Sequence, residues 1–228
     1  MFAVFKTIGD TVNTAARVEG ATKELGLPLD AQPKFIAVKE PVFPFTKFPK
    51  AKVFLGPEMR STGEVMSMAA TYGEAVAKAF IAGGSNLPVA GGVFISVNAN
   101  DKNYRMVEVA KGFRRLGFQV YATGGTATFL TKHGVENTPV FKVNEGRPNV
   151  VDRIKNGDIH IVINTPLGEV SRFDELAIGS AALEAKLPII TTVSAAAAVV
   201  KGIQSIKEGT STVRSLQEYH AELGLGTP

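Results

Sequence analysis

The second half of the chain alternates short apolar runs with helical patterns, and this alternation constrains the fold more than any other feature. GVFISV (92–97) is a continuous apolar run, and a helical pattern over 104–117 follows it. Strands without in-and-out alternation, each joined to the next by a helix, are typical of a parallel sheet covered on both faces. Because such crossovers are right-handed, we predict a doubly wound α/β domain over 92–228.

The other elements of this domain continue the same alternation. Further strands are expected at 118–123, 138–143, 159–165 and 187–192. Further helices are expected at 126–134, 149–157, 174–186, 194–209 and 213–224. Every predicted strand is thus followed by a helix, as a doubly wound sheet requires.

Residues 1–85 have a different pattern. Between 33 and 66, β-branched and aromatic residues alternate with prolines, which indicates short or edge strands with tight connections. Helices are expected on either side of this stretch, at 11–26 and 68–84. SNLPVAGG (85–92) has linker composition, so we predict a smaller α+β unit ahead of the parallel sheet.

Composition excludes several kinds of function. The chain has no cysteine, which excludes disulfides, thiolate metal sites and cysteine nucleophiles. Its three histidines, His133, His160 and His220, are far apart and match no metal-ligand spacing. No apolar run reaches the roughly 18 residues of a membrane span, and the start does not resemble a signal peptide. We therefore expect a cytoplasmic protein with no membrane partner and no bound metal.

The charge of the chain bears on the kind of ligand. The net charge is +4, and the basic residues are spread along the sequence. Nucleic-acid binding usually requires a denser basic face, so no nucleic-acid partner is expected. A small anionic molecule suits this charge better.

A glycine-rich turn follows the second predicted strand of the sheet. In open α/β sheets, ligands bind beyond the carboxyl ends of the strands. The glycines of Thr123-Gly124-Gly125-Thr126 let the backbone approach a ligand, and the next helix begins with unpaired N–H groups that attract phosphate. The alternative is a plain strand-to-helix turn with Thr126 as the N-cap.

Neighbouring strand ends favour the phosphate site over the plain turn. Lys102 and Lys142 are ammonium donors, and Asn164 offers an amide suited to a ribose or a base edge. A single lysine at a strand end is usually solvated, but these residues converge from four strand ends of one predicted sheet. Asp101 is the only carboxylate beside them, so we expect a site that binds an anion, with no catalytic residue.

Several motifs resemble a known family. Four segments resemble the methylglyoxal-synthase-like domain that ends carbamoyl-phosphate synthase large subunits: SVNANDK, YATGGTATFL, EGRPNVVDRIKNGDIHIVINT and SLQEYH. An earlier segment resembles the end of the second ATP-grasp unit of the same enzymes: KFIAVKEPVFPFTKFPKAKVFLGPEMRSTGEVM. The resemblance covers roughly 33–228. It implies that 1–85 is the remnant of an ATP-grasp synthetic unit and that 92–228 is a methylglyoxal-synthase-like regulatory domain.

The resemblance implies an effector site for UMP or IMP. The family's contacts to the effector's phosphate and nucleoside fall on residues that the strand ends had already indicated: Lys102, Thr123, Thr126, Lys142 and Asn164. Pro166 stands where bacterial relatives often have a second threonine, and Thr165 is expected to substitute for it. Ile190 replaces the aspartate of ornithine-activated relatives, which argues against activation by ornithine.

The resemblance also implies partners. The matched region lacks the ATP-grasp core, so ATP and Mg²⁺ are expected only in the full synthase and the chain alone is expected to be inactive. Its partners would be the rest of the large subunit and the glutaminase small subunit, in pyrimidine and arginine biosynthesis. Apolar surface left by the absent core could drive self-association into a homo-oligomer.

Two alternatives belong to other classes of protein. A stand-alone lyase like methylglyoxal synthase would need an aspartate near the strand end that bears Asn164, and none is present there. Residues 7–26 resemble the Asn-x-x-x-Arg helix of class III nucleotide cyclases through Asn13 and Arg17. The metal-binding aspartates of a cyclase would lie upstream of Met1, so we favour a piece of a synthase.

Overall fold

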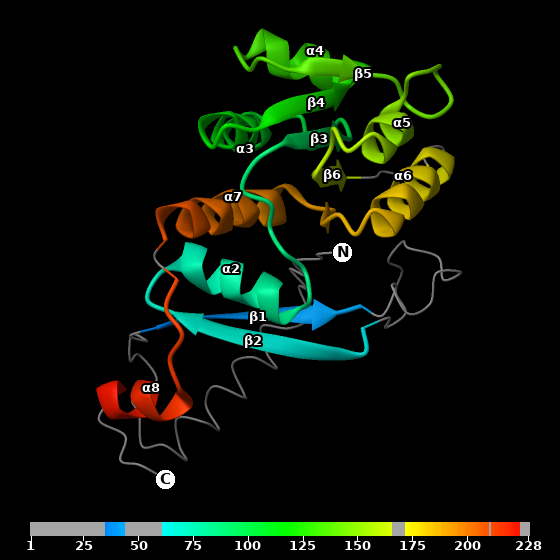
Figure 1. The fold of residues 1–228 in the computed structure, drawn as a ribbon. Helices are drawn as coiled ribbons and strands as arrows, with labels where there is room; N and C mark the ends of the chain where they lie inside the picture. Colours follow the sequence, from blue (N-terminus) through cyan, green and yellow to red (C-terminus); the bar gives the residue numbers. More distant parts are fainter. Residues whose placement is uncertain (1–34, 44–60, 166–171, 210, 224–228) are drawn as a thin grey trace.

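The computed structural model describes residues 35–43, 61–165, 172–209 and 211–223 (Figure 1). The early part contains strands β1 (Ile36–Val42) and β2 (Gly63–Ala69) and helix α2 (Tyr72–Ala82). The rest of the chain alternates strands and helices in this order: β3 (Gly92–Val97), α3 (Tyr104–Arg115), β4 (Gln119–Thr123), α4 (Gly124–Lys132), β5 (Thr138–Val140), α5 (Val150–Lys155), β6 (Ile161–Thr165), α6 (Arg172–Glu184), β7 (Ile189–Ile190), α7 (Val193–Glu208) and α8 (Leu216–Leu223).

The later strands form one parallel sheet. Its five strands lie in the order β5-β4-β3-β6-β7, and every neighbouring pair is parallel. The chain first moves outward from β3 through β4 to β5 and then returns to β6 on the other side of β3. The order therefore reverses between β3 and β6, which confirms the predicted doubly wound α/β fold.

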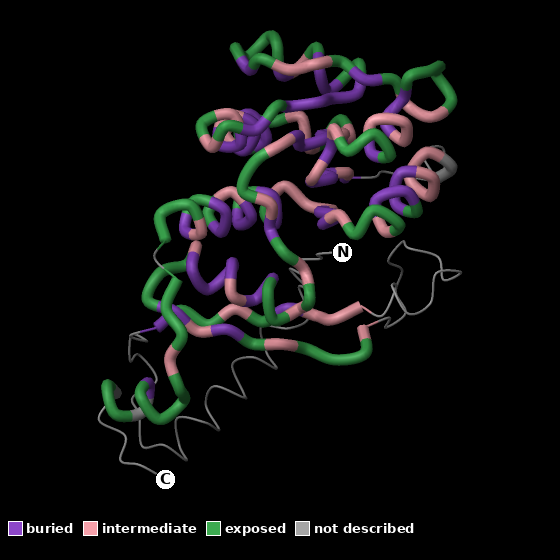
Figure 2. Tube along the Cα trace, viewed as in Figure 1, coloured by how far each residue is buried: buried purple, intermediate pink, exposed green. Residues whose placement is uncertain are grey.

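Helices cover both faces of this sheet. One face packs its apolar residues against α3, α4 and α7, which contribute Met106, Phe113, Leu130, Val199 and Ile203. The other face packs against α5 and α6, through Val150, Ile154, Ile178 and Ala182. Figure 2 shows the buried residues along the strands and on the inner sides of the helices. Because helices cover both faces, the middle strand β3 is buried at nearly every position instead of at every second one.

The early elements form a second layer. β1 and β2 pair antiparallel from Ile36 opposite Ala69 to Val42 opposite Gly63. Helix α2 lies between this pair and α7 (Figure 1). Two glycines bring α2 and α7 together: a β-carbon on Gly73 would lie 2.6 Å from the Lys201 carbonyl oxygen, and one on Gly202 would lie 3.2 Å from Val76. The small antiparallel sheet agrees with the predicted α+β unit.

The predicted helix at 68–84 is wrong at its start. Met68 and Ala69 belong to β2, and the helix begins only at Tyr72. Thr71 is the N-cap, and its hydroxyl accepts a hydrogen bond from the Glu74 backbone N–H at 3.3 Å. Pairing with β1, which is distant in sequence, overrides the helical propensity of Met and Ala here.

Other predicted boundaries also shift. β5 and β7 are shorter than expected, and α4 begins at Gly124 instead of Thr126. The predicted helix at 11–26, the cyclase-like residues 7–26 and the position of Pro166 lie outside the described residues. Within the described part of the chain, no helix is long and apolar enough to cross a membrane.

Candidate functional site

The predicted site residues lie at the carboxyl edge of the parallel sheet. In the strand register, Asn164 is opposite Ser96 and Thr165 is opposite Val97, which places both beside the end of β3. Thr123 ends β4 opposite Val140 of β5. The edge therefore brings together the ends of neighbouring strands on both sides of the point where strand order reverses.

Two threonines and a serine connect the ends of β3 and β4. The Thr123 hydroxyl donates to the Ser96 hydroxyl at 3.2 Å and lies 3.4 Å from the Thr126 hydroxyl. The Thr126 hydroxyl accepts from the Val97 backbone N–H at 3.2 Å. Thr126 is only 1% exposed, so this bond ties the first turn of α4 to β3. Thr123, and not Thr126, is the N-cap of α4, so the predicted N-cap is wrong, while phosphate binding at this turn stays a prediction.

The first turn of α4 keeps its backbone N–H groups available. Thr123 makes no side-chain capping bond, and Gly124 and Gly125 are exposed. A β-carbon on Gly125 would lie 3.0 Å from the ammonium nitrogen of Lys102. The turn contains no acidic residue. The ammonium of Lys102 and the positive end of a helix therefore converge on one exposed stretch of backbone, an arrangement that favours an anion.

Asn98 organises the turn that carries Lys102, and the sequence analysis did not single it out. Its side-chain oxygen accepts from the N–H groups of Asn100 at 2.8 Å and Asp101 at 3.2 Å. Its side-chain nitrogen donates to the Asp101 carboxylate at 2.6 Å and to the Thr165 carbonyl oxygen at 3.1 Å. Asn98 thus joins β3 to β6 and holds the carboxylate of Asp101 beside the end of β3. An Asn two to three residues before polar turn residues is the sequence signal for such a turn.

Lys142 is placed by the edge strand. It follows Phe141, whose carbonyl oxygen accepts from the Val150 N–H at 3.1 Å, and its own N–H donates to Glu145 at 2.8 Å. Within the described residues, neither Lys102 nor Lys142 forms an ion pair with a carboxylate. Both lysines are half-buried as residues, and no described carboxylate lies within ion-pair distance of their ammonium groups.

Comparison with known proteins relates the chain to one enzyme family. Residues 105–191 match the model of the MGS-like domain. Over 200 residues, which are 88% of this chain, it is 44% identical to the carbamoyl phosphate synthase large chain of Archaeoglobus fulgidus. It is 50% identical over 184 residues to the large chain of Acidobacterium capsulatum, and 48% identical over 197 residues to the large chain's C-terminal section in Aquifex aeolicus. The chain is a homologue of carbamoyl phosphate synthase large chains.

The chain spans only part of these relatives. It covers 19% of the Archaeoglobus protein, 17% of the Acidobacterium protein and 36% of the Aquifex C-terminal section. Because 88% of this chain aligns with the Archaeoglobus protein, that alignment is long enough to include both the parallel sheet and the preceding antiparallel pair.

Ile190, where the sequence argues against activation by ornithine, lies in strand β7. Ile190 is buried in β7, and the next turn ends at Thr192, the N-cap of α7, whose hydroxyl accepts from the Ala195 N–H at 3.1 Å. An apolar side chain therefore fills the position where ornithine-activated relatives are expected to have a carboxylate.

A hollow in the described part of the chain lies away from the predicted site residues. A hollow of about 920 Å³ runs between α3 and α7 and is lined by Tyr104, Val109, Leu116 and Val200, among others. None of the six predicted site residues lines it. Among the described residues, no group of three His, Asp or Glu side chains could hold a metal ion. The strand-end edge is therefore selected by its chemistry and not by its volume.

Proposed function

We propose that this chain is the effector-binding part of a carbamoyl phosphate synthase large chain and that its ligand is a nucleoside monophosphate of the UMP or IMP type. The relatives are large chains of this synthase, and the strand-end edge has the charge and donors for a phosphate. In this role the chain works in the cytoplasm, in pyrimidine and arginine biosynthesis.

The observation that carries the proposal is the approach of Lys102 to the first turn of α4. The ammonium nitrogen lies 3.0 Å from the position of a β-carbon on Gly125, so a side chain there would shift the ammonium by a few tenths of an ångström. A phosphate in front of this turn would accept hydrogen bonds from backbone N–H groups and from the ammonium. Hydrogen bonds to charged groups contribute about 1.5–3 kcal/mol each. Two such contacts together contribute about 3–6 kcal/mol, which corresponds to dissociation constants from several millimolar down to some tens of micromolar.

The remaining residues would complete the nucleotide site. Lys142 would add a second ammonium to the phosphate, and Asn164 would contact the ribose or base. The Thr165 hydroxyl accepts from the Asn98 N–H at 3.3 Å and from its side-chain nitrogen at 3.2 Å. A hydroxyl has two acceptor positions and one proton. Among the described residues nothing accepts its proton, so the proton could be donated to a ligand, which supports Thr165 as the substitute for a threonine at Pro166.

In the full synthase, effector binding would change activity through the contacts of this chain with the rest of the large chain. The glutaminase small subunit, ATP and Mg²⁺ belong to that assembly. The chain by itself would bind the effector without making carbamoyl phosphate. Effector binding can therefore be measured on this chain alone, without an assay of the synthase reaction.

The proposal is tested by calorimetric titration of the 228-residue chain with UMP, IMP, ornithine and inorganic phosphate. Binding of UMP or IMP below millimolar concentration is expected, and ornithine is expected to give no heat. Lys142→Ala and Thr123→Ala should each weaken nucleotide binding by about tenfold, or 1.4 kcal/mol. Lys132→Ala, in the last turn of α4, is the control and should bind as the wild type does. The proposal fails if neither nucleotide binds at millimolar concentration, and the site assignment fails if Lys142→Ala binds normally.

A further inference from the structure

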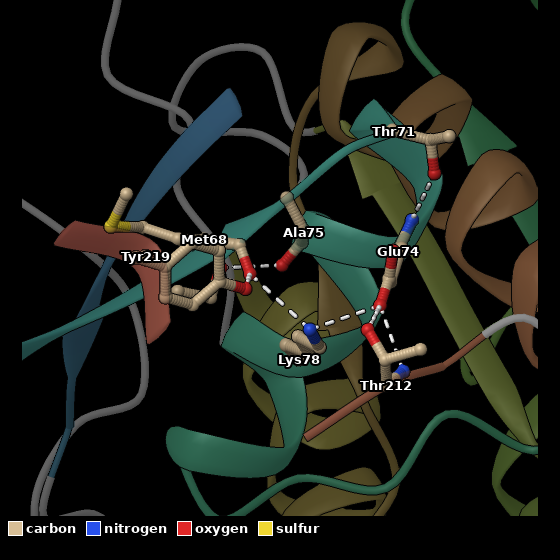
Figure 3. A network of polar contacts seen from close by, with 8 residues as sticks. Met68, Thr71, Glu74, Ala75, Lys78, Thr212 and Tyr219 are labelled. Carbon is tan, nitrogen blue, oxygen red and sulfur yellow. Dashed lines mark hydrogen bonds and ion pairs between the residues drawn. The ribbon is translucent and has the colours of Figure 1, made fainter. Parts of the chain in front are cut away.

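The last described residues, 211–223, lie across the early layer of the molecule. After α7, residues 211–223, here called the C-terminal strap, run along α2 and the β1/β2 pair and end in α8 (Figure 1). Two anchors fix the strap to residues that lie 138 and 151 positions earlier in the sequence. The contacts are shown in Figure 3.

The first anchor is the carboxylate of Glu74 in the first turn of α2. It is only 5% exposed and accepts hydrogen bonds from the Thr212 backbone N–H at 2.9 Å and from the Thr212 hydroxyl at 3.0 Å. Lys78 adds an ion pair at 2.9 Å. Burial raises the pKa of Glu74, but the hydrogen bonds from Thr212 and Lys78 outweigh burial and lower the pKa below its usual value. The strap thus supplies two of the donors that hold a buried carboxylate ionised.

The second anchor is Tyr219 of α8. Its hydroxyl donates to the Met68 carbonyl oxygen at 2.9 Å, and its ring meets Phe35 edge-on with centroids 4.7 Å apart. Lys78 donates to the same Met68 oxygen at 3.3 Å, so the two anchors share one acceptor on β2 (Figure 3). Arg214 lies over the Tyr219 ring at 4.8 Å. The anchors therefore form one connected network.

Outside the anchors the strap is exposed. Val213 is 99% exposed and Leu216 is 59% exposed, and α8 has only 8 residues. Segments with few buried apolar contacts open locally at a small fraction of the global free energy of unfolding. The strap can therefore open while the two sheets stay folded, and opening would expose Glu74 to water.

Helix α7 connects the strap to the carboxyl edge of the sheet. It begins at Val193, directly after β7, and β7 lies next to β6, which carries Asn164 and Thr165. Its other end, at Glu208, is followed by Gly209 in the left-handed conformation and then by the strap. The close glycine contacts between α7 and α2 leave little room for one helix to move without the other.

We propose that the C-terminal strap is a two-state coupling element whose closure on α2 and β2 is favoured when a phosphorylated ligand occupies the strand-end edge. This inference rests on the proposed function, because it needs a ligand at that edge. Coupling between two sites is reciprocal, so a closed strap would in turn raise the affinity for the ligand. The strap would then carry the regulatory signal from the parallel sheet to the β1/β2 layer.

Amide hydrogen exchange on the full 228-residue chain, with and without saturating UMP or IMP, tests this coupling. Exchange over 211–223 should slow by about fivefold or more on binding. The double variant T212V/Y219F removes one donor from each anchor with little change in shape. In this variant without nucleotide, the amides of 211–223 should exchange about tenfold faster than in the wild type. The dissociation constant of the nucleotide should rise by at most the factor by which nucleotide slows exchange of the strap in the wild type.

The matched control is V213T, the reverse isosteric change at the neighbouring, fully exposed position. It should exchange and bind as the wild type does. The inference is overturned if nucleotide binds but exchange over 211–223 does not change, or if T212V/Y219F keeps the full slowing and affinity. Absence of any nucleotide binding would overturn the proposed function, and the coupling with it. The calorimetric and exchange results thus separate the two failures.

Discussion

The ammonium of Lys102 and the glycines of α4 determine what the strand-end edge can bind. In most helices, Gly→Ala in the first turn is neutral or stabilising by up to about 1 kcal/mol. At Gly125, the new β-carbon would lie 3.0 Å from the Lys102 nitrogen, so the flexible end of the lysine would shift by a few tenths of an ångström. We predict that Gly125→Ala weakens UMP or IMP binding by about two- to threefold, or roughly 0.5 kcal/mol. The free energy of unfolding should stay the same or increase; calorimetry and urea denaturation measure the two quantities.

A double-mutant cycle shows whether this effect acts through Lys102. In a Lys102→Ala background there is no ammonium to displace, so Gly125→Ala should have no further effect on affinity. Equal losses in both backgrounds would mean that the added methyl group blocks the ligand directly, contrary to the geometry described above.

Thr126 has a structural role beside its proposed part in binding. Its buried hydroxyl accepts from the Val97 N–H, so Thr126→Val would leave that N–H without a partner. The expected loss of stability is about 1–3 kcal/mol in urea denaturation. Thr128→Val, on the exposed side of the same helix, removes only the hydrogen bond from the Thr128 hydroxyl to the Gly124 carbonyl oxygen one turn earlier. This change should cost less than about 0.5 kcal/mol. Equal losses for the two variants would contradict the tie between α4 and β3.

At this scale the sequence identifies residue types better than their partners. Thr123 and Lys102 could be selected because strand ends of a parallel sheet meet at one edge. The sequence could not show that Thr126 bonds to β3 or that Asn98 holds Thr165, because both contacts depend on the register between strands. Whether the six selected residues bind a nucleotide stays a prediction.

Among the elements, α7 makes the closest helix contacts, with α2 and with α3. A β-carbon on Gly73 would lie 2.6 Å from the Lys201 carbonyl oxygen, and one on Gly112 would lie 2.8 Å from Val200. We predict that Gly73→Ala destabilises the chain by about 1–3 kcal/mol, because backbone must move to make room. Gly124→Ala, where the β-carbon meets nothing within 4 Å, should be neutral or slightly stabilising. Urea midpoints compare the two, and a stable Gly73→Ala variant would refute the close contact.

The elements of the parallel sheet could be predicted well because each one carries its own pattern. β3 coincides with the predicted strand at 92–97, and α3 and α7 lie within about two residues of their predicted bounds. The error at 68–84 arose where local propensity and long-range pairing disagree. The sequence MAAT (68–71) suits a helix, but β1 recruits its first residues into a strand.

For the whole molecule, Glu40 makes stability depend on pH. It lies in β1 with 6% exposure, and a β-carbon on Gly83 at the end of α2 would lie 2.6 Å from its carboxylate oxygen. Burial raises the pKa of Glu40 from 4.5 to about 7. The folded chain therefore holds this proton at pH values where the unfolded chain has lost it. The contribution of Glu40 to stability falls as the pH rises from about 4.5 to about 7.

Replacing this carboxyl removes the dependence. We predict that Glu40→Gln is more stable than the wild type by about 1 kcal/mol at pH 8, after allowance for solvent screening, and that the difference disappears near pH 4.5. Urea denaturation at both pH values measures it. A constant difference across this range would show that Glu40 does not carry a raised pKa in the folded chain.

The sequence could not predict how the two layers are joined. The strap contacts of Thr212 and Tyr219 cross 138 and 151 residues and depend on single hydrogen bonds, which leave no periodic pattern in a sequence. The resemblance to the synthase identified both layers, and the physical contacts between them come only from the structure.

The central claim is that a phosphate binds at the first turn of α4. Nuclear magnetic resonance of the ¹⁵N-labelled chain, titrated with UMP and then with IMP, tests it most directly. We predict that the backbone N–H signals of Gly124, Gly125 and Thr126 shift more than any others and that Lys102→Ala reduces these shifts at equal nucleotide concentration. Nucleotide binding that leaves these three N–H signals unchanged would refute phosphate binding at the first turn of α4.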